Sequence, residues 1–514
     1  MQFRYKRALT RAQQQAGELA KGVFFIGTWP ARKLEEGLDY IYGYDKESGV
    51  NPRVNTRILS LFLICLSVAA LVTWQTVQSP GLRNEAGWMA GIFTLACLLW
   101  MTEALPLFAT ALLIMGLEVL LLANPGSWNG LGFEQGNNPA FTFFLEPLSD
   151  PIIVLFLGGF ILAKAAVKRG VDAALASWVL RFFGNTPPRV MMGMMVITAF
   201  FSMWMSNTAT ATMMITLLVP VFSQLPGEER FQKGLLLSIP FAANIGGMGT
   251  PIASPPNAVA VSALGRAGEP VLFLQWVALA LPFVLLLLFI CYQLLYRRYK
   301  PINARSTIEL PRKPIDGRGR FVIFIFILTI LLWLTEQWHG LPTAVVALIP
   351  IVAFTATGLL SKNDINSLEW SILLLIAGGI ALGRGITATG LDQVFVSLLP
   401  GNSPYMLSIL VLVTLLLSTF ISNTATANLL IPIGISLAMS NAAAGPLYVQ
   451  QVGLSIALAA SMAMALPVST APNTIAYAQG SLVTSDFVKT GGLLGLIALL
   501  LISGINWLLR LLPL

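Results

Sequence analysis

The sequence carries little charge for its length. Only 11% of its 514 residues are Asp, Glu, Lys or Arg, whereas 56% are hydrophobic. Soluble proteins carry about 25% charged residues, so this composition excludes a soluble globular protein. Many of the apolar stretches are long enough to cross a bilayer as helices. We therefore predict an all-α polytopic membrane protein.

Residues that build metal, redox and nucleophilic sites are also scarce. Cys65, Cys97 and Cys291 each lie in an apolar run without metal-like spacing, and the one histidine, His339, lies beside a turn. We interpret the cysteines as small buried hydrophobes. A proton relay or a membrane-embedded enzyme would need buried acids, a metal cluster or a nucleophile with its base, and no such group is evident. We expect no enzymatic activity and no bound cofactor.

The net charge of +8 follows the expected membrane topology. Residues 1–57 and 297–320 together hold 18 of the 31 Lys and Arg residues, whereas 123–150 holds none. Because short cytoplasmic loops collect Lys and Arg, we place the two basic segments inside and 123–150 outside. The charge therefore predicts no nucleic-acid partner. Residues 1–57 lack the order of a secretory signal, so we interpret them as a cytoplasmic or membrane-surface segment.

Hydropathy predicts about eleven crossings and two re-entrant hairpins. The crossings cover 58–79, 87–104, 105–123, 151–168, 235–265, 271–296, 321–338, 342–360, 371–386, 452–484 and 490–512. The stretches 189–220 and 402–440 are apolar with a polar centre. Counting either as one crossing would place the basic 297–320 loop on the wrong side. We therefore predict that the first hairpin opens inward and the second outward, with the N-terminus cytoplasmic and the C-terminus outside.

The polar centres of the two hairpins are copies of one phrase. SNTATAT occupies 206–212 and SNTATAN occupies 422–428. The Pro-Asn stretch GTPIASPPNAVAV (249–261) matches ALPVSTAPNTIAY (465–477) at the same 216-residue offset. Two upstream pairs also match, namely 155–172 with 374–392 and 100–114 with 333–349. Four features in the same order indicate an internal duplication.

The duplication divides the chain. Each half holds five crossings and one hairpin, an odd number, so the second half must be inverted relative to the first. The predicted segments are residues 1–57 at the N-terminus, a first helix and loop at 58–86, a first repeat at 87–296, a basic cytoplasmic linker at 297–320 and a second repeat at 321–514. Inverted repeats with broken helices are typical of secondary transporters.

The paired phrases predict one polar site. In hydrocarbon a non-helical Ser-Asn-Thr tip or a Pro-rich break is tolerated only where it packs in protein or lines a cavity, so we expect the four breaks to meet. Hydroxyl and carbonyl oxygens suit a hard cation such as sodium, while side-chain donors and the positive ends of half-helices suit carboxylates. A single motif of this kind would more often be a packing contact between helices. Its duplication favours a site that holds an anion beside cations.

These motifs resemble the divalent anion/sodium symporter (DASS) family of INDY-type dicarboxylate transporters, over roughly residues 87–512. The resemblance implies a homodimer in the plasma (bacterial inner) membrane. Each protomer would have a scaffold domain and a transport domain that moves as an elevator. Members of the family couple a sodium gradient to uptake of succinate, malate, fumarate or citrate, while others carry sulfate or exchange dicarboxylates. The implied partners are a dicarboxylate, sodium ions as coupling ions and the lipid bilayer.

The resemblance also implies site residues. The substrate would bind Ser206, Asn207, Thr208, Ser254, Pro255, Ser422, Asn423, Thr424, Thr470 and Ala471. One sodium ion would bind among Ser202, Ser206, Asn207 and the backbone near Ala253, and the other among Ser418, Ser422, Asn423 and the backbone near Ser469. The serine four positions before each motif is one helical turn away. At Ala471 the sequence departs from the family, which often has a second proline there.

Symport and exchange are distinguished by the residues near the tips. Family members that exchange dicarboxylates without sodium can place a basic residue there, whereas this chain has Thr210 and Thr426. A neutral tip leaves a dianion uncompensated unless cations bind as well. The sequence therefore favours sodium-coupled uptake of C4-type dicarboxylates. Sodium-independent exchange and transport of citrate or sulfate stay open within the family, and a channel or a membrane enzyme are the alternatives from other classes.

Overall fold

The computed structural model describes residues 56–124, 131–133, 138–304, 307–308, 315–398, 405–440 and 445–511. Within these ranges the regular elements are helical, apart from an isolated bridge between Asn124 and Ala140. Seven of the described helices are long and apolar enough to cross a membrane, and five shorter apolar helices accompany them. The predicted all-α polytopic membrane class is thus confirmed. The number of crossings stays a prediction, and residues 1–55 lie outside the described part.

The described helices divide between the first and second halves of the chain. The first half contains α3 (Thr56–Val77), α4 (Asn84–Thr102), α5 (Leu107–Leu121), α6 (Phe141–Leu145), η1 (Glu146–Ser149), α7 (Pro151–Lys168), α8 (Val171–Phe183), α9 (Pro187–Ser202), α10 (Asn207–Phe222), α11 (Glu229–Gly246), α12 (Pro255–Arg266) and α13 (Phe273–Arg298). The second half contains α14 (Gly317–Leu334), α15 (Glu336–His339), α16 (Thr343–Val346), α17 (Leu348–Ala356), α18 (Lys362–Asn366), α19 (Trp370–Thr389), α20 (Leu391–Leu398), α21 (Met406–Phe420), α22 (Asn423–Met439), α23 (Pro446–Ser461), α24 (Ala471–Tyr477), α25 (Thr484–Phe487), η2 (Val488–Gly492) and α26 (Leu493–Leu511).

The two stretches 235–265 and 452–484, which hydropathy treats as single crossings, are both interrupted. The first divides into α11 and α12, and the second into α23 and α24. The interruptions coincide with the two Pro-Asn stretches. Hydropathy also does not mark α8 and α20, because each is short and carries polar residues on one face. Gly170 (φ 63°) and Gly390 (φ 73°) precede these two helices in a left-handed conformation that glycine adopts without steric cost.

The two halves are interlocked through α7 and α19. In the first half, α7 packs against α16 and α17 of the second, and α19 of the second packs against α4 and α5 of the first. The contacts are close: a Cβ atom built on Gly158 would lie 2.7 Å from the Cβ of Ala347, and one on Gly378 would lie 2.4 Å from the Cβ of Ala111. Both glycines belong to equivalent Gly-Gly pairs. Each half therefore buries a helix of the other.

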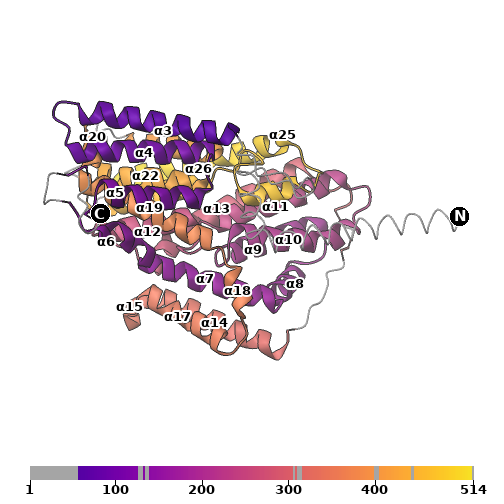
Figure 1. Cartoon of the computed structure of the whole chain (residues 1–514). Helices are drawn as coiled ribbons and strands as arrows, with labels where there is room; N and C mark the ends of the chain where they lie inside the picture. Colours follow the sequence, from indigo (N-terminus) through magenta and orange to yellow (C-terminus); the bar gives the residue numbers. More distant parts are fainter. Residues whose placement is uncertain are drawn as a thin grey trace, which may run out of the picture.

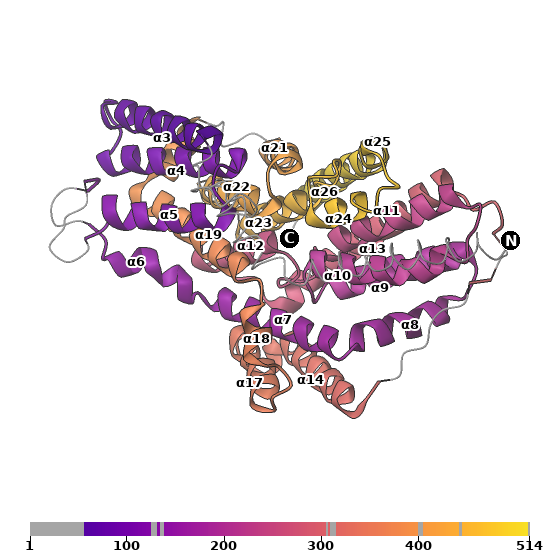
Figure 2. The same cartoon turned by 45° about the vertical axis from the view of Figure 1, so that its right-hand side comes forward.

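The buried apolar side chains divide into one large cluster and smaller ones around it. The large cluster joins side chains from α9 to α13 with side chains from α21 to α24 and α26. The helices α7, α14, α16, α17 and α19 form a second cluster, and α3, α4 and α5 contribute to two others. Figures 1 and 2 show α3 and α4 at one edge of the molecule and α14 and α17 at the opposite edge. On α3, side chains such as Ile64 and Trp74 are exposed, as expected for a surface that faces lipid.

Glu118 of α5 is fully buried inside the bundle. The sequence does not indicate whether this residue faces a partner or the outer interface. In the structure a Cβ atom built on Gly385 of α19 would lie 2.5 Å from Glu118 Oε1. Neither carboxylate oxygen has a hydrogen-bond partner among the described residues. The residue therefore lies between α5 and α19, away from the outer surface.

Candidate functional site

Each Ser-Asn-Thr motif lies where one helix ends and the next begins. Ser206 is the N-cap of α10, and its hydroxyl accepts a hydrogen bond from Ala209 N at 3.3 Å. Ser422 is the N-cap of α22. The first N–H groups of both helices therefore point out of the helix ends, where the helix dipole is positive. Such ends attract anions.

In the first half, the serine one turn before the motif contacts the asparagine of the motif. Ser202 Oγ lies 2.6 Å from Asn207 Oδ1 and 2.7 Å from the backbone oxygen of Ala243. The Ser202 side chain is fully buried. The last residue of α9, the first residue of α10 and the last turn of α11 thus meet at three oxygen atoms.

The second half repeats this arrangement. Ser418 Oγ lies 2.8 Å from Asn423 Oδ1 and 2.7 Å from the backbone oxygen of Ala460. Each cluster holds three oxygens but a single hydroxyl proton, which can be donated to only one of the two neighbouring acceptors. With the amides oriented as in the structure, one short oxygen–oxygen contact in each cluster has no proton between its atoms. A cation among these oxygens would relieve that repulsion.

The asparagine of each Pro-Asn stretch stabilises the helix break in which it lies. Asn257 Nδ2 donates to the backbone oxygens of Gly247 (2.9 Å) and Thr250 (2.8 Å). Asn473 Nδ2 likewise donates to two backbone oxygens in the second break, at 3.1 and 2.9 Å. Each asparagine thus satisfies carbonyl groups that a continuous helix would have bonded. Ala471, where the resemblance implies a proline, is the first residue of α24, and Asn473 makes both of these bonds beside it.

The breaks of the two halves meet at the centre of the large cluster. Asn244 Nδ2 of α11 donates to Thr470 Oγ1 at 3.0 Å, and Ser254 Oγ lies 3.4 Å from Ser461 Oγ. All four side chains are buried. Asn244 and Ser461 do not belong to the motifs that the sequence singles out. Their equivalent position, one residue after Ala243 and after Ala460, is the signal that could have found them.

The first motif also touches the first break. A Cβ atom built on Gly247 would lie 2.3 Å from Asn207 Oδ1 and 2.6 Å from its Nδ2. The helix α10 contacts α11 and α24, and α22 contacts α12 and α23. Each motif helix therefore contacts the broken helices of both halves. Beside the tips, Thr424 is buried and Thr208 is half-buried.

The remaining predicted residues differ in their surroundings. Pro255 begins α12, and Ala253 N donates to the backbone oxygen of Thr250 at 3.3 Å. Ser469 Oγ donates to the backbone oxygen of Thr419 at 2.8 Å, which ties the second break to the end of α21. No hydrogen bond in the described part of the chain joins Ser206 to Ser202, or Ser422 to Ser418. The structure thus brings Ser202 with Asn207, and Ser418 with Asn423, into direct contact.

Ser206 contacts an acid that sequence motifs do not mark. Its hydroxyl donates to Glu369 Oε1 at 3.0 Å, across 163 residues of sequence. Burial raises the pKa of the Glu369 carboxyl, and the hydrogen bond from Ser206 opposes that rise. The first tip therefore has a carboxylic acid of the protein within its reach.

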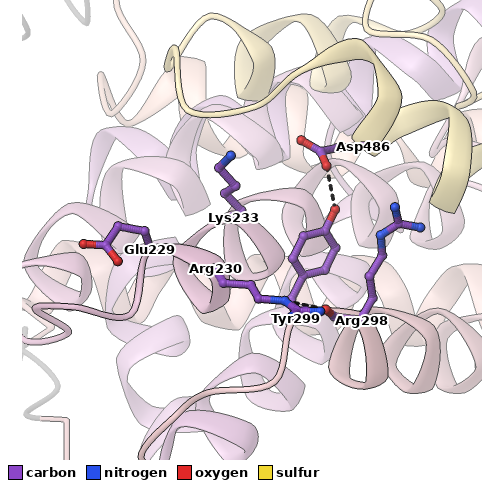
Figure 3. A pocket seen from close by; sticks show the side chains of 6 residues that line it. All are labelled: Glu229, Arg230, Lys233, Arg298, Tyr299 and Asp486. Carbon is purple, nitrogen blue, oxygen red and sulfur yellow. Dashed lines mark hydrogen bonds between the residues drawn. The ribbon is translucent and has the colours of Figure 1, made fainter.

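A separate pocket of about 360 Å³ lies at the start of α11, lined by Glu229, Arg230, Lys233, Arg298, Tyr299 and Asp486. Figure 3 shows Tyr299 directed at Asp486, and its hydroxyl donates to Asp486 Oδ1 at 2.9 Å. Burial and the bond to Asp486 raise the pKa of Tyr299 to about 12. Lys233 lies about 16 Å along α11 from Asn244. The pocket is thus distinct from the paired motifs. Contacts among its lining residues hold the beginning of the 297–320 linker against α11 and α25.

Two motif helices and two broken helices around a buried polar centre are an arrangement typical of secondary membrane transporters. Residues 97–450 match the model of the CitMHS citrate transporter family. The chain therefore belongs to the citrate transporter family, and the predicted resemblance to dicarboxylate transporters is confirmed at the level of the family.

Named relatives transport more than one kind of anion. The sodium-dependent dicarboxylate transporter SdcS of Staphylococcus saprophyticus is 30% identical over 461 residues, with 80% of this chain and 85% of that protein covered. The inorganic phosphate transporter PHO87 of Saccharomyces cerevisiae is 33% identical over 398 residues, covering 74% of this chain and 41% of that protein. The uncharacterized transporter C3B8.04c of Schizosaccharomyces pombe is 31% identical over 471 residues, covering 87% and 52%. The chain thus spans about half the length of the yeast relatives.

A solved structure shares the fold. The crystal structure of the YdaH transporter of Alcanivorax borkumensis matches with a TM-score of 0.53 over 83% of this chain and 98% of that chain, at 12% sequence identity. At this identity the match shows a common fold alone.

Proposed function

We propose that this protein is a secondary active transporter that couples sodium to the uptake of C4-type dicarboxylates such as succinate, malate and fumarate. The observation that carries the proposal is the pair of three-oxygen clusters, one at Ser202 and one at Ser418. Hydroxyl, amide and carbonyl oxygens are ligands that hard cations prefer. The sodium-dependent relative SdcS supports the same choice of ion and substrate.

The substrate would bind between the two tips. Its carboxylates would accept hydrogen bonds from Asn207 and Thr208 on one side and from Asn423 and Thr424 on the other, at the positive ends of α10 and α22. No lysine or arginine belongs to either motif. Two sodium ions at the clusters would supply the charge that a dianion needs. Binding of the ions would thereby favour binding of the substrate, which is the basis of coupling.

The arrangement of the core supports an elevator. The large apolar cluster joins both motif pairs and both broken helices, while α3 and α4 lie at one edge of the molecule and α14 and α17 at the opposite edge (Figures 1 and 2). In our proposal the large cluster moves as one body past these outer helices and carries the site across the bilayer. The pairs α9–α10 and α21–α22 would be re-entrant hairpins, and the outer helices would join two copies into a homodimer.

Phosphate is a second candidate substrate because PHO87 is a relative. Phosphate is also an oxyanion, and the same hydroxyl, amide and backbone donors can bind it. Citrate, sulfate and sodium-independent exchange of dicarboxylates are further alternatives within the family. These candidates differ in uptake assays, where each anion can be supplied alone.

The test is uptake of labelled succinate into proteoliposomes with an inward sodium gradient and an empty lumen. We expect saturable, sodium-dependent uptake that is lost in Asn207→Ala and Asn423→Ala and retained in Asn363→Ala, a control on the exposed helix α18. Uptake that needs a lumen preloaded with dicarboxylate would replace symport by exchange. Phosphate uptake without succinate uptake would overturn the substrate. Flux that does not saturate would indicate a channel.

A further inference from the structure

The hydroxyl of the first tip already has a carboxylate partner. Ser206 Oγ accepts from Ala209 N and donates its proton to Glu369 Oε1 at 3.0 Å. A hydroxyl has one proton to donate. While this bond is made, Ser206 cannot donate to another anion.

The second tip differs in this respect. Ser422 occupies the same position at the start of α22, and its side chain makes no capping hydrogen bond. None of the described acidic side chains forms a hydrogen bond with it. Its hydroxyl is therefore available to an anion, in contrast to that of Ser206.

The position of Glu369 in the repeat explains the difference between the two tips. Glu369 directly precedes α19, and Asp150 directly precedes the equivalent helix α7. Asp150 accepts hydrogen bonds from Ile152 N at 3.0 Å and Ser262 Oγ at 3.0 Å, and it lies 3.7 Å from Arg266 Nη1. Glu369 forms no ion pair with any of the described basic side chains. Asp150 is thus compensated by Arg266, while Glu369 is directed at Ser206.

A carboxylate at this place is chemically equivalent to one end of the proposed substrate. It accepts a hydrogen bond from the same Ser206 hydroxyl, which has one proton to donate, so the two carboxylates compete for it. We propose that Glu369 is an internal carboxylate that occupies the Ser206 tip and that an anionic group of the substrate, in a dicarboxylate its second carboxylate, must displace. The inference rests on the proposed function in that the transported ligand is an anion held between the tips. One end of the substrate would engage Ser422 first, and the other would then replace Glu369.

The experiment compares Glu369→Ala and Glu369→Gln with the wild-type full-length chain in proteoliposomes. We expect the apparent KM for succinate to fall about tenfold in Glu369→Ala, because a hydrogen bond to a charged group no longer has to be broken. The fall should be smaller in Glu369→Gln, since the amide is uncharged but still accepts a hydrogen bond. In the Ser206→Ala background, Glu369→Ala should leave KM unchanged. Glu269→Gln is the matched control, since Glu269 follows α12 and does not contact either tip.

Three results would overturn the inference. An unchanged or higher KM in both Glu369 variants, at wild-type thermal stability, would show that the carboxylate does not compete with substrate. A fall in KM that persists in the Ser206→Ala background would show that Glu369 does not act through Ser206. A higher sodium requirement in both variants would make Glu369 a cation ligand instead.

The anion is chosen so that the two proposals can fail separately. Wild-type protein is first assayed with succinate, phosphate, sulfate and citrate, and the variants are then compared on the anion that it transports. Transport of phosphate without succinate would overturn the proposed substrate, while the comparison of KM values on phosphate still decides the role of Glu369. A monomethyl ester of succinate adds an independent arm. Having one carboxylate, it should inhibit wild type and Glu369→Ala equally, and a stronger inhibition of the variant would contradict the proposed order of binding.

Discussion

Adding one methyl group at Gly247 tests the geometry around Asn207. In Gly247→Ala the new Cβ would lie 2.3 Å from Asn207 Oδ1, 2.6 Å from Nδ2 and 2.8 Å from Cγ. All three distances are shorter than van der Waals contact, so the Asn207 amide must turn away. It then loses its 2.6 Å contact with Ser202. If this contact forms part of an ion site, its loss weakens sodium binding by about 1 to 3 kcal/mol, which corresponds to about 5- to 150-fold in sodium affinity.

The expected result is a large loss of sodium-dependent uptake with a small loss of stability. The three nearest atoms that the methyl group meets all belong to the Asn207 side chain at the start of α10. This side chain can turn without disturbing the core. Gly265→Ala is the control, because a Cβ there meets nothing within 4 Å and alanine favours the helix by about 0.5 to 1 kcal/mol. Uptake and its sodium dependence are measured in proteoliposomes, and the midpoint of thermal unfolding in detergent. Wild-type sodium and succinate dependence in Gly247→Ala would refute the contact.

Three further predictions concern other parts of the molecule. Ser418→Ala should raise the sodium concentration for half-maximal uptake about 5- to 150-fold, because its cluster loses the central oxygen; unchanged sodium dependence would exclude the cluster as an ion site. Gly378→Ala should lower the midpoint of thermal unfolding by an amount equivalent to about 1 to 3 kcal/mol, since the Cβ would lie 2.4 Å from the Cβ and 2.8 Å from the Cα of Ala111, which cannot rotate away. Tyr299→Phe should cost about 1 kcal/mol of stability through the lost bond to Asp486 and leave the KM for succinate unchanged, whereas a changed KM would connect the pocket to the transport site.

Much of the geometry of the candidate site could be predicted because duplication is visible in a single sequence. The two Ser-Asn-Thr motifs and the two Pro-Asn stretches mark four places where helices break, and the structure has a break at each of them. The serine one turn earlier follows from helical periodicity. These features are local, so spacing along the chain is enough to find them.

Other features depend on contacts between distant residues. Asn244 is one polar residue within an apolar run, and its role appears only when Thr470 is brought beside it across 226 residues. Glu369 meets Ser206 across 163 residues, with no motif at either α18 or the start of α19. The close approach of Gly158 to Ala347 is likewise a product of the interlocked halves. Hydropathy reports length and composition, and therefore contains no information on such pairs.

The two motifs differ in sequence only at their last residue, Thr212 in the first and Asn428 in the second. This difference affects how each motif helix packs. Asn428 donates to the backbone oxygen of Leu375 at 3.1 Å and fits because its neighbour on α19 is Gly379, where a Cβ would lie 2.0 Å from the amide. Thr212, at the same position of the first motif, bonds to the backbone of its own helix.

The three-oxygen clusters are closely alike in the two halves, so under the proposed function duplication would supply two equivalent positions for cations. The tips are not alike, since Ser206 holds Glu369 and Ser422 makes no such bond. This asymmetry comes from a residue outside the repeated phrase. Discrimination between anions would therefore depend on Glu369 and the tip that it occupies, whereas coupling to sodium would depend on the elements that the two halves share.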